Sequence, residues 1–141
     1  MSHTYLQLYY HFVWSAKGRE DLLAESELRT WLINAIERQC RKRGGTCLAC
    51  NVMPDHVHLL VELEPTVAVA TFIGQVKGAV SHLAEEWRPG VGLDWQEGYG
   101  ALTLRRADLG TVAAYIRDQA AIHAARRIKA VLERAGSDAQ P

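Results

Sequence analysis

The sequence has few of the features that mark secreted or membrane proteins. Three cysteines among 141 residues are too few for a disulfide scaffold, and an odd number suits a reducing compartment. No apolar run approaches the roughly 20 residues that a membrane-spanning helix needs. No charged leader followed by an apolar stretch stands at the N-terminus. We therefore expect a soluble, cytoplasmic protein.

The chain also has no net charge at pH 7. Lys and Arg together number 16, as do Asp and Glu, so the chain shows no overall basic signal of the kind expected for a protein that coats nucleic acid. Hydrophobic residues make up 48% and charged residues 23%, which excludes a wholly disordered chain. The length fits one domain, 1–141, with an ordered core over about 4–134 and a frayed tail.

The hydrophobic pattern predicts elements in the order β-α-β-β-α-β-α. The expected strands are 5–14, 46–53, 56–63 and 101–105, and the expected helices are 26–42, 67–87 and a last helix from a cap at Asp108 to about Arg134. The short segment 53–55 predicts a hairpin between the second and third strands. The first six elements match an α+β, ferredoxin-like split βαβ plan, in which helices cover one face of an antiparallel sheet. The seventh element is an extra C-terminal helix.

The strongest local signal is the pair His56 and His58. Residues two apart on a strand point to one face, so these imidazoles lie side by side while Val57 and Leu59 point to the other face. Two histidines on one face are a natural pair of metal ligands. His-x-His also occurs by chance, and a solvated surface pair is the alternative interpretation.

A second signal lies on the predicted last helix. Tyr115 and Gln119 are spaced i and i+4, and His123 continues the same stripe. Taken alone, Tyr115 reads as a boundary tyrosine that packs its ring and exposes its hydroxyl. A phenol has a pKa near 10 and is a poor nucleophile at neutral pH, but a divalent cation beside a phosphodiester would offset the charge of its attack. The two signals therefore suggest one metal-assisted phosphoryl-transfer site.

Four segments of the sequence resemble the motifs of one known protein family. Segment 53–61 resembles the HUH motif (His, hydrophobic, His) of the small single-tyrosine transposases of bacterial insertion sequences, and 115–119 resembles their tyrosine helix. Residues 10–15 resemble the first strand of this family. Residues 95–100 resemble the loop before its last strand, particularly in the branch that includes the REP-associated tyrosine transposases. The similarity runs from about residue 5 to 123, with the motifs in family order.

The resemblance implies an enzyme of DNA transposition. His56 and His58 would bind Mg²⁺ or Mn²⁺ with Gln119 as third ligand, and Tyr115 would attack single-stranded DNA. The products would be a 5′-phosphotyrosine link and a free 3′-hydroxyl, and a second strand transfer would resolve the link. Family members recognise DNA hairpins, and in many of them two subunits join and exchange tyrosine helices. We therefore also expect a homodimer.

Further DNA contacts are predicted at Lys77, Arg105 and Arg106. The two arginines immediately precede the tyrosine helix. Lys77 lies between Gly74 and Gly78 in the sequence. Two glycines four residues apart leave one face of a helix without side chains, which favours close packing of the helix on the sheet or, alternatively, close approach of a DNA backbone.

Two other functions stay open. A ferredoxin-like sheet can bind single-stranded nucleic acid by stacking, without catalysis. The aromatic residues available for stacking are Tyr5, Tyr9, Tyr10, Phe12 and Trp14. A metal-dependent phosphoesterase acting through activated water, with Tyr115 merely structural, is the other alternative.

The remaining histidines and cysteines receive no role. Cys47 and Cys50 form a C-x-x-C pattern, but residues three apart on a regular strand face opposite sides, and no second pair exists for a structural zinc. His11 lies in a strand and is expected to be a satisfied core or surface histidine. His82 lies on the polar side of a helix.

Overall fold

The computed structural model describes residues 4–17, 23–119 and 133. The elements within these residues are β1 (Tyr9–Ser15), α1 (Ser26–Lys42), β2 (Gly45–Val52), β3 (His56–Leu63), α2 (Val69–Trp87), β4 (Gly100–Leu104), the 3-10 turn η2 (Arg106–Asp108) and α3 (Leu109–Arg117). This order confirms the predicted sequence of strands and helices. Within the described ranges, no helix is both long and apolar enough to cross a membrane.

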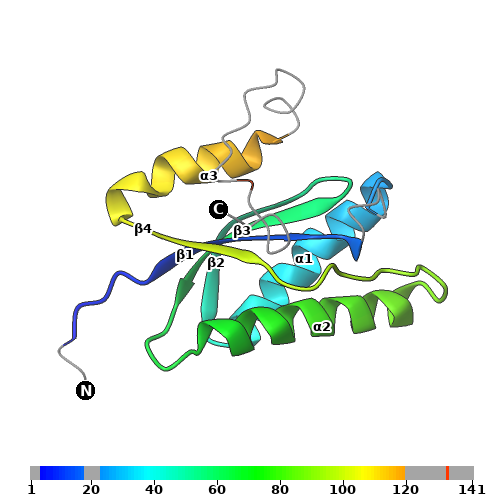
Figure 1. Ribbon diagram of the computed structural model, residues 1–141, viewed down its shortest axis with the longest axis horizontal. Coiled ribbons are helices and arrows are strands. Elements are labelled where there is room, and N and C mark those ends of the chain that lie inside the picture. The colour runs from blue at the N-terminus through cyan, green and yellow to red at the C-terminus, as the bar shows by residue number, and fades with distance from the viewer. Residues whose placement is uncertain (1–3, 18–22, 120–132, 134–141) are drawn as a thin grey trace.

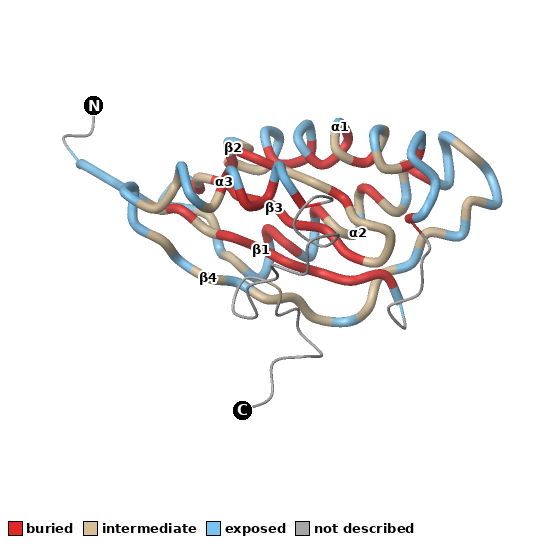
Figure 2. The backbone as a smooth tube through the Cα atoms, turned by 90° about the horizontal axis from the view of Figure 1, so that it is seen from above, coloured by how far each residue is buried: buried red, intermediate tan, exposed pale blue. Residues whose placement is uncertain are grey.

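The strands form a 4-stranded sheet in the order β2-β3-β1-β4, in which each neighbouring pair is antiparallel. Helices α1 and α2 cover one face of this sheet, and α3 lies over the other face (Figure 1). The α+β, ferredoxin-like prediction is therefore confirmed. The extra helix gives the sheet a second covered face, so its two central strands are buried on both sides (Figure 2).

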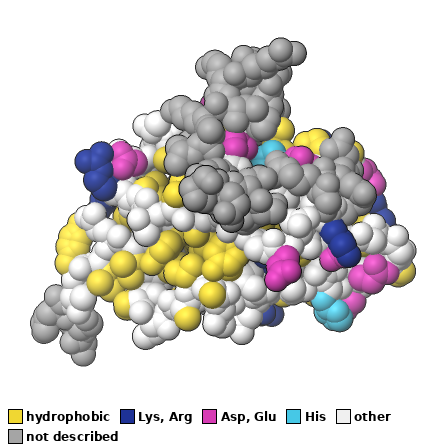
Figure 3. Space-filling view, in the orientation of Figure 1, with side chains coloured by type: hydrophobic (Ala, Val, Ile, Leu, Met, Phe, Trp, Pro, Cys, Tyr) yellow, Lys and Arg dark blue, Asp and Glu magenta, His cyan; other side chains and the backbone are white. Residues whose placement is uncertain are grey.

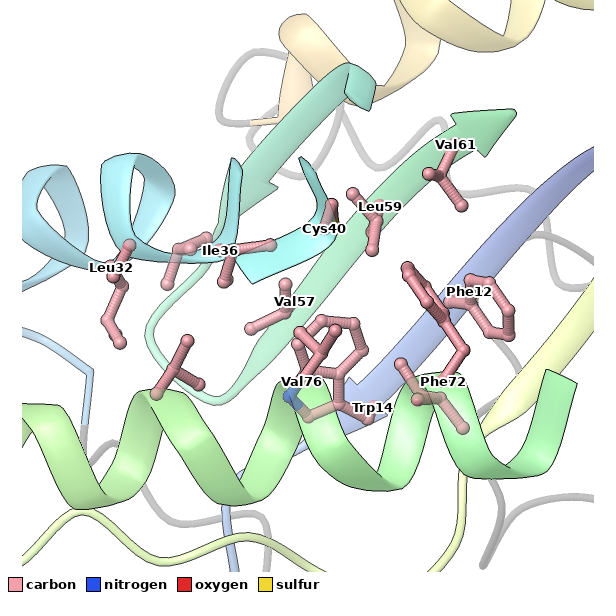
Figure 4. Packing of buried hydrophobic residues seen from close by; sticks show 14 of the residues in the cluster. Phe12, Trp14, Leu32, Ile36, Cys40, Val57, Leu59, Val61, Phe72 and Val76 are labelled. Carbon is pink, nitrogen blue, oxygen red and sulfur yellow. The ribbon is translucent and has the colours of Figure 1, made fainter. Parts of the chain in front are cut away.

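The larger core fills the space between the sheet and helices α1 and α2. Val57, Leu59 and Val61 of β3 point into it, together with Phe12 of β1 and Phe72 of α2 (Figure 4). Each of these side chains is almost completely buried. At about 1.5–3 kcal/mol for each fully buried apolar side chain, this layer supplies most of the hydrophobic stabilisation of the sheet.

A smaller core lies on the opposite face, between the sheet and α3. It contains Ala49 of β2, Leu60 of β3, and Ala113 and Ile116 of α3. Because side chains of a strand alternate, Leu60 shares its face of the sheet with His56 and His58. The helix that carries the tyrosine therefore packs directly beside the histidine pair.

The β2–β3 connection is a tight hairpin, as predicted. The backbone N–H of Met53 donates to the carbonyl of His56 at 2.8 Å. Two flanking segments bind the turn, because Ala16 donates to the carbonyl of Asp55 at 2.8 Å and Leu23 to that of Pro54 at 2.9 Å. Hydrogen bonds from Met53, Ala16 and Leu23 thus hold the turn that leads into the start of β3, where the histidines lie.

The loop before β4 closes the larger core. The indole N–H of Trp95 donates to the backbone carbonyl of Lys77 at 2.9 Å, and its ring meets that of Trp14 at 5.9 Å between centroids. The backbone N–H of Gln96 also donates to the carbonyl of Ser15 at 2.8 Å. The segment 95–100, singled out by its resemblance, is in part a packing motif of the fold.

The ends of two elements differ from the predictions. Strand β1 begins at Tyr9, where its register with both β3 and β4 begins. Helix α3 ends at Arg117, where Asp118 leaves the helical region, so the predicted continuous helix to Arg134 is wrong at this point. Residues 120–132 and 134–141 lie outside the described residues, and so do His123, which continues the predicted stripe, and the predicted frayed tail. The carboxylate of Asp108 accepts hydrogen bonds from Arg105 instead of capping α3.

Two local interpretations are also wrong. The pairing of β2 with β3 shifts register between Cys47 and Ala49, and this bulge brings both Cys47 and Cys50 against the larger core. Burial raises the pKa of Cys47 to about 11, which disfavours a reactive thiolate. The glycines Gly74 and Gly78 do not serve close packing, because a Cβ atom at either position would meet open space.

We expect Ile116→Ala to loosen α3 selectively. The fully buried side chain belongs to the small core under α3, so its loss should lower the free energy of unfolding by about 2–5 kcal/mol. Hydrogen exchange should accelerate more in α3 than in α2. The exposed Thr111→Ala on the same helix is the control, with no comparable change. Equal acceleration of hydrogen exchange in α2 and α3 would contradict the prediction that α3 loosens without the rest of the fold.

Candidate metal centre and tyrosine site

The two histidines of β3 are buried under α3. His56 is 4% exposed and His58 is fully buried. Both lie on the α3 face, because the alternation of the strand sends their neighbours into the larger core. In the sheet register they stand opposite Ser15 and Val13 of β1. The solvated surface pair is therefore ruled out, and the two imidazoles form part of an interior polar site.

Each imidazole has one ring nitrogen engaged by a neighbour. Nδ1 of His56 lies 2.6 Å from Oδ1 of Asp55, and Nδ1 of His58 lies 2.9 Å from Nε2 of His11. Such partners fix the orientation and tautomer of a metal-binding histidine. Both Nε2 atoms point toward one carboxylate, that of Glu133, at 3.2 Å from His56 and 3.1 Å from His58.

His11 is therefore more than a satisfied core histidine. Its ring stacks on that of His58 with centroids 5.2 Å apart, and it is 1% exposed. Burial and the neighbouring His58 lower the pKa of His11 to about 3, so its imidazole is neutral at physiological pH. A neutral imidazole can accept the Nδ1 proton of His58, which leaves Nε2 of His58 for a ligand. The first strand thus contributes a supporting residue whose role the sequence pattern did not indicate.

Tyr115 lies against the same histidines. Its ring packs edge-on to His58, with centroids 6.1 Å apart and an interplanar angle of 79°. The residue is 5% exposed, so it is not a boundary tyrosine with a solvated hydroxyl. That hydroxyl donates a hydrogen bond to Oε2 of Glu133. The predicted nucleophile and the predicted ligand pair are therefore brought together within one chain.

Asn51 fixes the end of the tyrosine helix. Its side-chain amide donates to the backbone carbonyls of Ile116 at 3.0 Å and Arg117 at 3.3 Å. These carbonyls belong to the last turn of α3, whose acceptors have no partner within the helix. Asn51 is also the register partner of His58 in β3, so one strand pair holds both His58 and the end of the helix. A lone asparagine in a strand gave no sequence signal for this contact.

Gln119, the predicted third ligand, is fully buried beside Tyr115. Its side-chain Nε2 donates to the backbone carbonyl of Tyr115 at 2.9 Å. Among the described His, Cys, Asp and Glu residues, one group has the spacing of metal ligands: His56, His58 and Glu133, whose ligand atoms lie within 4.8 Å of one another. Glu133 follows Tyr115 by 18 positions and belongs to no motif, so only the fold could have identified it.

The charges in this site favour a cation. Burial would lower the pKa of His56, but hydrogen bonds to the carboxylates of Asp55 and Glu133 outweigh it and raise that pKa. Burial likewise opposes ionisation of Glu133, yet its contacts with His56, His58 and Tyr115 hold its pKa below the usual range. The site therefore pairs an ionised carboxylate with one imidazole, that of His56, whose charged form is stabilised, and a bound metal ion would supply positive charge at the same place.

The donor set fits a divalent ion. Ligands that occupy adjacent positions around an octahedral ion at about 2.1 Å lie about 3 Å from one another. The two separations between imidazole nitrogens and carboxylate oxygen, 3.2 and 3.1 Å, match that spacing. Two imidazoles and a carboxylate also leave further coordination positions for water or phosphate oxygens.

The predicted DNA-binding residues lie elsewhere. The ammonium of Lys77 donates to the backbone carbonyls of Gln96 at 3.0 Å and Gly98 at 2.8 Å, and burial lowers its pKa. Lys77 thus helps to hold the loop before β4. Arg105 pairs with Asp108, and Arg106 is exposed at the start of η2. On the face seen in Figure 3, the basic side chains of the described residues stand apart and form no single patch.

We expect His11→Phe to weaken divalent-metal binding about 10- to 100-fold, because His58 would lose the partner that orients it. Isothermal titration of the metal-free protein with Mn²⁺ measures this affinity. His82→Phe, which changes an exposed histidine of α2, is the matched control and should bind like the parent protein. An unchanged affinity in His11→Phe would show that the contact does not support the site.

Comparisons with known proteins agree with this geometry. The family model described as IS200-like transposase matches residues 4–119, which include both histidines, Tyr115 and Gln119. The chain is 29% identical to the ISDra2 transposase TnpA of Deinococcus radiodurans, over 80% of this chain and 84% of that protein. It is 28% identical to the transposase of insertion sequence element IS200 from Salmonella typhimurium, over 61% of this chain and 56% of that protein.

Solved structures share the fold. A crystal structure described as that of a transposase from Deinococcus radiodurans superposes with a TM-score of 0.67 at 26% identity, covering 84% of this chain and 96% of that one. A REP-associated tyrosine transposase bound to a REP hairpin gives a TM-score of 0.64 at 21% identity, covering 87% and 74%. Since the family model spans most of the sequence and the site geometry is present, the chain belongs to the IS200-like transposase family.

Proposed function

We propose that the chain cleaves single-stranded DNA and transfers the cut strand, with Tyr115 as the covalent nucleophile. The observation that carries this proposal is the contact between Tyr115 and His58, whose ring centroids are 6.1 Å apart in a buried site. A phenol beside a pair of metal-type ligands is the arrangement that tyrosine attack on a phosphodiester requires. Membership of a transposase family supports the same reaction class.

Three side chains of this chain would hold Mg²⁺ or Mn²⁺: His56 and His58 through Nε2, and Gln119 as the amide ligand predicted from the resemblance. A bound divalent ion polarises a phosphate oxygen and offsets charge in the transition state. Nitrogen ligands suit Mn²⁺ better than Mg²⁺, so Mn²⁺ is expected to serve at least as well. Asp55 and His11 keep the two imidazoles in orientation through their Nδ1 atoms.

In the proposed reaction the phenolic oxygen of Tyr115 bonds to phosphorus, and the bond from phosphorus to the 3′ oxygen breaks. The proton lost by the phenol ends on that 3′ oxygen, which leaves as a hydroxyl. The product is a 5′-phosphotyrosine link. A 3′-hydroxyl of another strand then attacks the same phosphorus, and the phenol of Tyr115 recovers a proton as it leaves. Asn51 acts as a positioning residue, because it fixes the helix end beside the nucleophile.

Recognition of a DNA hairpin belongs to the proposal as well, since a relative of the same fold is solved with a REP hairpin. Arg105, Arg106 and Lys77 stay the predicted DNA contacts, and both arginines are exposed and so accessible to a phosphate. A homodimer stays a prediction too.

Covalent capture tests the chemistry directly. Labelled single-stranded DNA from the flanks of the gene, incubated with the protein and Mn²⁺, should give an adduct on a denaturing gel. We expect the adduct to disappear with EDTA, with Tyr115→Phe and with His56→Ala. Tyr99→Phe, outside the site, is the matched control and should retain it. Metal-dependent cleavage that survives Tyr115→Phe would instead indicate water attack, and hairpin binding without any adduct would indicate a recognition module.

A mixing experiment tests how the site is assembled. Tyr115 and His58 contact each other within one chain, so a mixture of His56→Ala and Tyr115→Phe proteins should stay inactive in adduct formation. As a control, each variant is mixed separately with the parent protein, which shows whether mixing itself inhibits adduct formation. Recovery of adduct in the double mixture would mean that subunits exchange their tyrosine helices.

A further inference from the structure

Glu133 makes contacts that none of the recognised motifs accounts for. One carboxylate oxygen, Oε1, lies 3.2 Å from Nε2 of His56 and 3.1 Å from Nε2 of His58. The other oxygen, Oε2, accepts the hydrogen bond of the Tyr115 hydroxyl. The side chain is 15% exposed, so the contacts lie inside the molecule and not on its surface. A single carboxylate thus touches both predicted ligands and the predicted nucleophile.

The two histidines can present only one nitrogen each to a metal ion. Their Nδ1 atoms are engaged by Asp55 and His11, so the Nε2 atoms are the ones that remain for coordination. Oε1 of Glu133 lies 3.2 Å from Nε2 of His56 and 3.1 Å from Nε2 of His58. An ion bound by the two Nε2 atoms would therefore meet this oxygen as its next ligand.

The chemistry of the ion points to the same residue. Mg²⁺ and Mn²⁺ prefer oxygen ligands, and Mg²⁺ sites in proteins normally include a carboxylate. Two neutral imidazoles and an amide would leave the full charge of the ion uncompensated in a buried site. A carboxylate halves that charge, and burial of the ion becomes correspondingly less unfavourable.

We propose that Glu133 is a ligand of the divalent ion and at the same time holds the nucleophile: Oε1 completes the set formed by His56 and His58, and Oε2 keeps the Tyr115 hydroxyl beside the ion. The inference rests on the proposed function for the role of Tyr115, but the ligand role is independent of it. It also goes beyond the ligand set implied by the family resemblance, in which Gln119 is the third ligand. Gln119 and Glu133 can both coordinate, since each contributes a separate oxygen.

Metal titration of the full chain tests the ligand role. Isothermal titration and Mn²⁺ electron paramagnetic resonance would compare the parent protein with Glu133→Gln, Glu133→Asp and Gln119→Ala. We expect Glu133→Gln to weaken Mn²⁺ binding at least about tenfold, the lower range seen when residues of a metal site are replaced. Glu133→Asp keeps the charge and should bind more tightly than Glu133→Gln. The exposed Glu86→Gln on α2 is the matched control, with unchanged affinity.

The positioning role needs a separate measurement. At Mn²⁺ concentrations that saturate each variant, Glu133→Gln should form the covalent adduct at least about tenfold more slowly than the parent protein, and Tyr115→Phe should bind Mn²⁺ within about twofold of the parent protein. Circular dichroism and thermal unfolding in EDTA establish that each variant is folded. Should Glu133→Gln alone be unfolded, Glu133→Asp takes its place, and a loss of affinity in that variant supports the proposal.

Two outcomes would overturn a part of the proposal, and a third would separate it from the proposed function. Parent-like Mn²⁺ affinity in Glu133→Gln would overturn the ligand role. An adduct that forms in Glu133→Gln as fast as in the parent protein, or faster, would overturn the positioning role. A parent protein that binds Mn²⁺ through Glu133 but forms no adduct would support the ligand role while the proposed function fails, so the two failures are distinguishable.

Discussion

Strand β3 alternates between two environments, and the rest of the site depends on this alternation. Its odd-numbered residues point into the larger core, where Val57, Leu59 and Val61 anchor the strand between α1 and α2. Its even-numbered residues then have to face α3, and two of them are His56 and His58. A shift of one residue in register would bury the imidazoles among the aliphatic side chains of the larger core and turn the valines toward the polar site under α3. Hydrophobic burial therefore fixes the direction of the two imidazoles.

The position of Tyr115, the proposed nucleophile, depends on a much smaller set of contacts. Helix α3 is held by the few apolar residues around Leu60 and Ile116, and by the two hydrogen bonds from Asn51 to its last turn. A short helix with so little buried area is an element of low local stability. The fold thus separates the sheet, which is anchored by the larger core, from a more weakly docked helix that carries Tyr115.

Buried polar groups at this surface are tolerated because each is matched by another. Asp55 engages His56, His11 engages His58, and Glu133 meets both imidazoles and the phenol. An isolated buried charge would cost several kcal/mol, about as much as a small domain can lose without unfolding. The network spreads that cost over opposite charges. It also orients every group toward one point, which is what catalysis by a metal ion and a nucleophile requires.

The residue pattern alone was enough to predict the order of the elements and the sheet face on which His56 and His58 lie, because the two-residue period of a strand is local. It did not predict that α3 ends at Arg117, before Gln119. Tertiary structure alone decided the roles of His11, Asn51 and Glu133. Each contacts a partner far away in the sequence, and no local pattern encodes such a contact. It also decided that Cys47 and Cys50 share a face, because a bulge depends on the strand paired beside it.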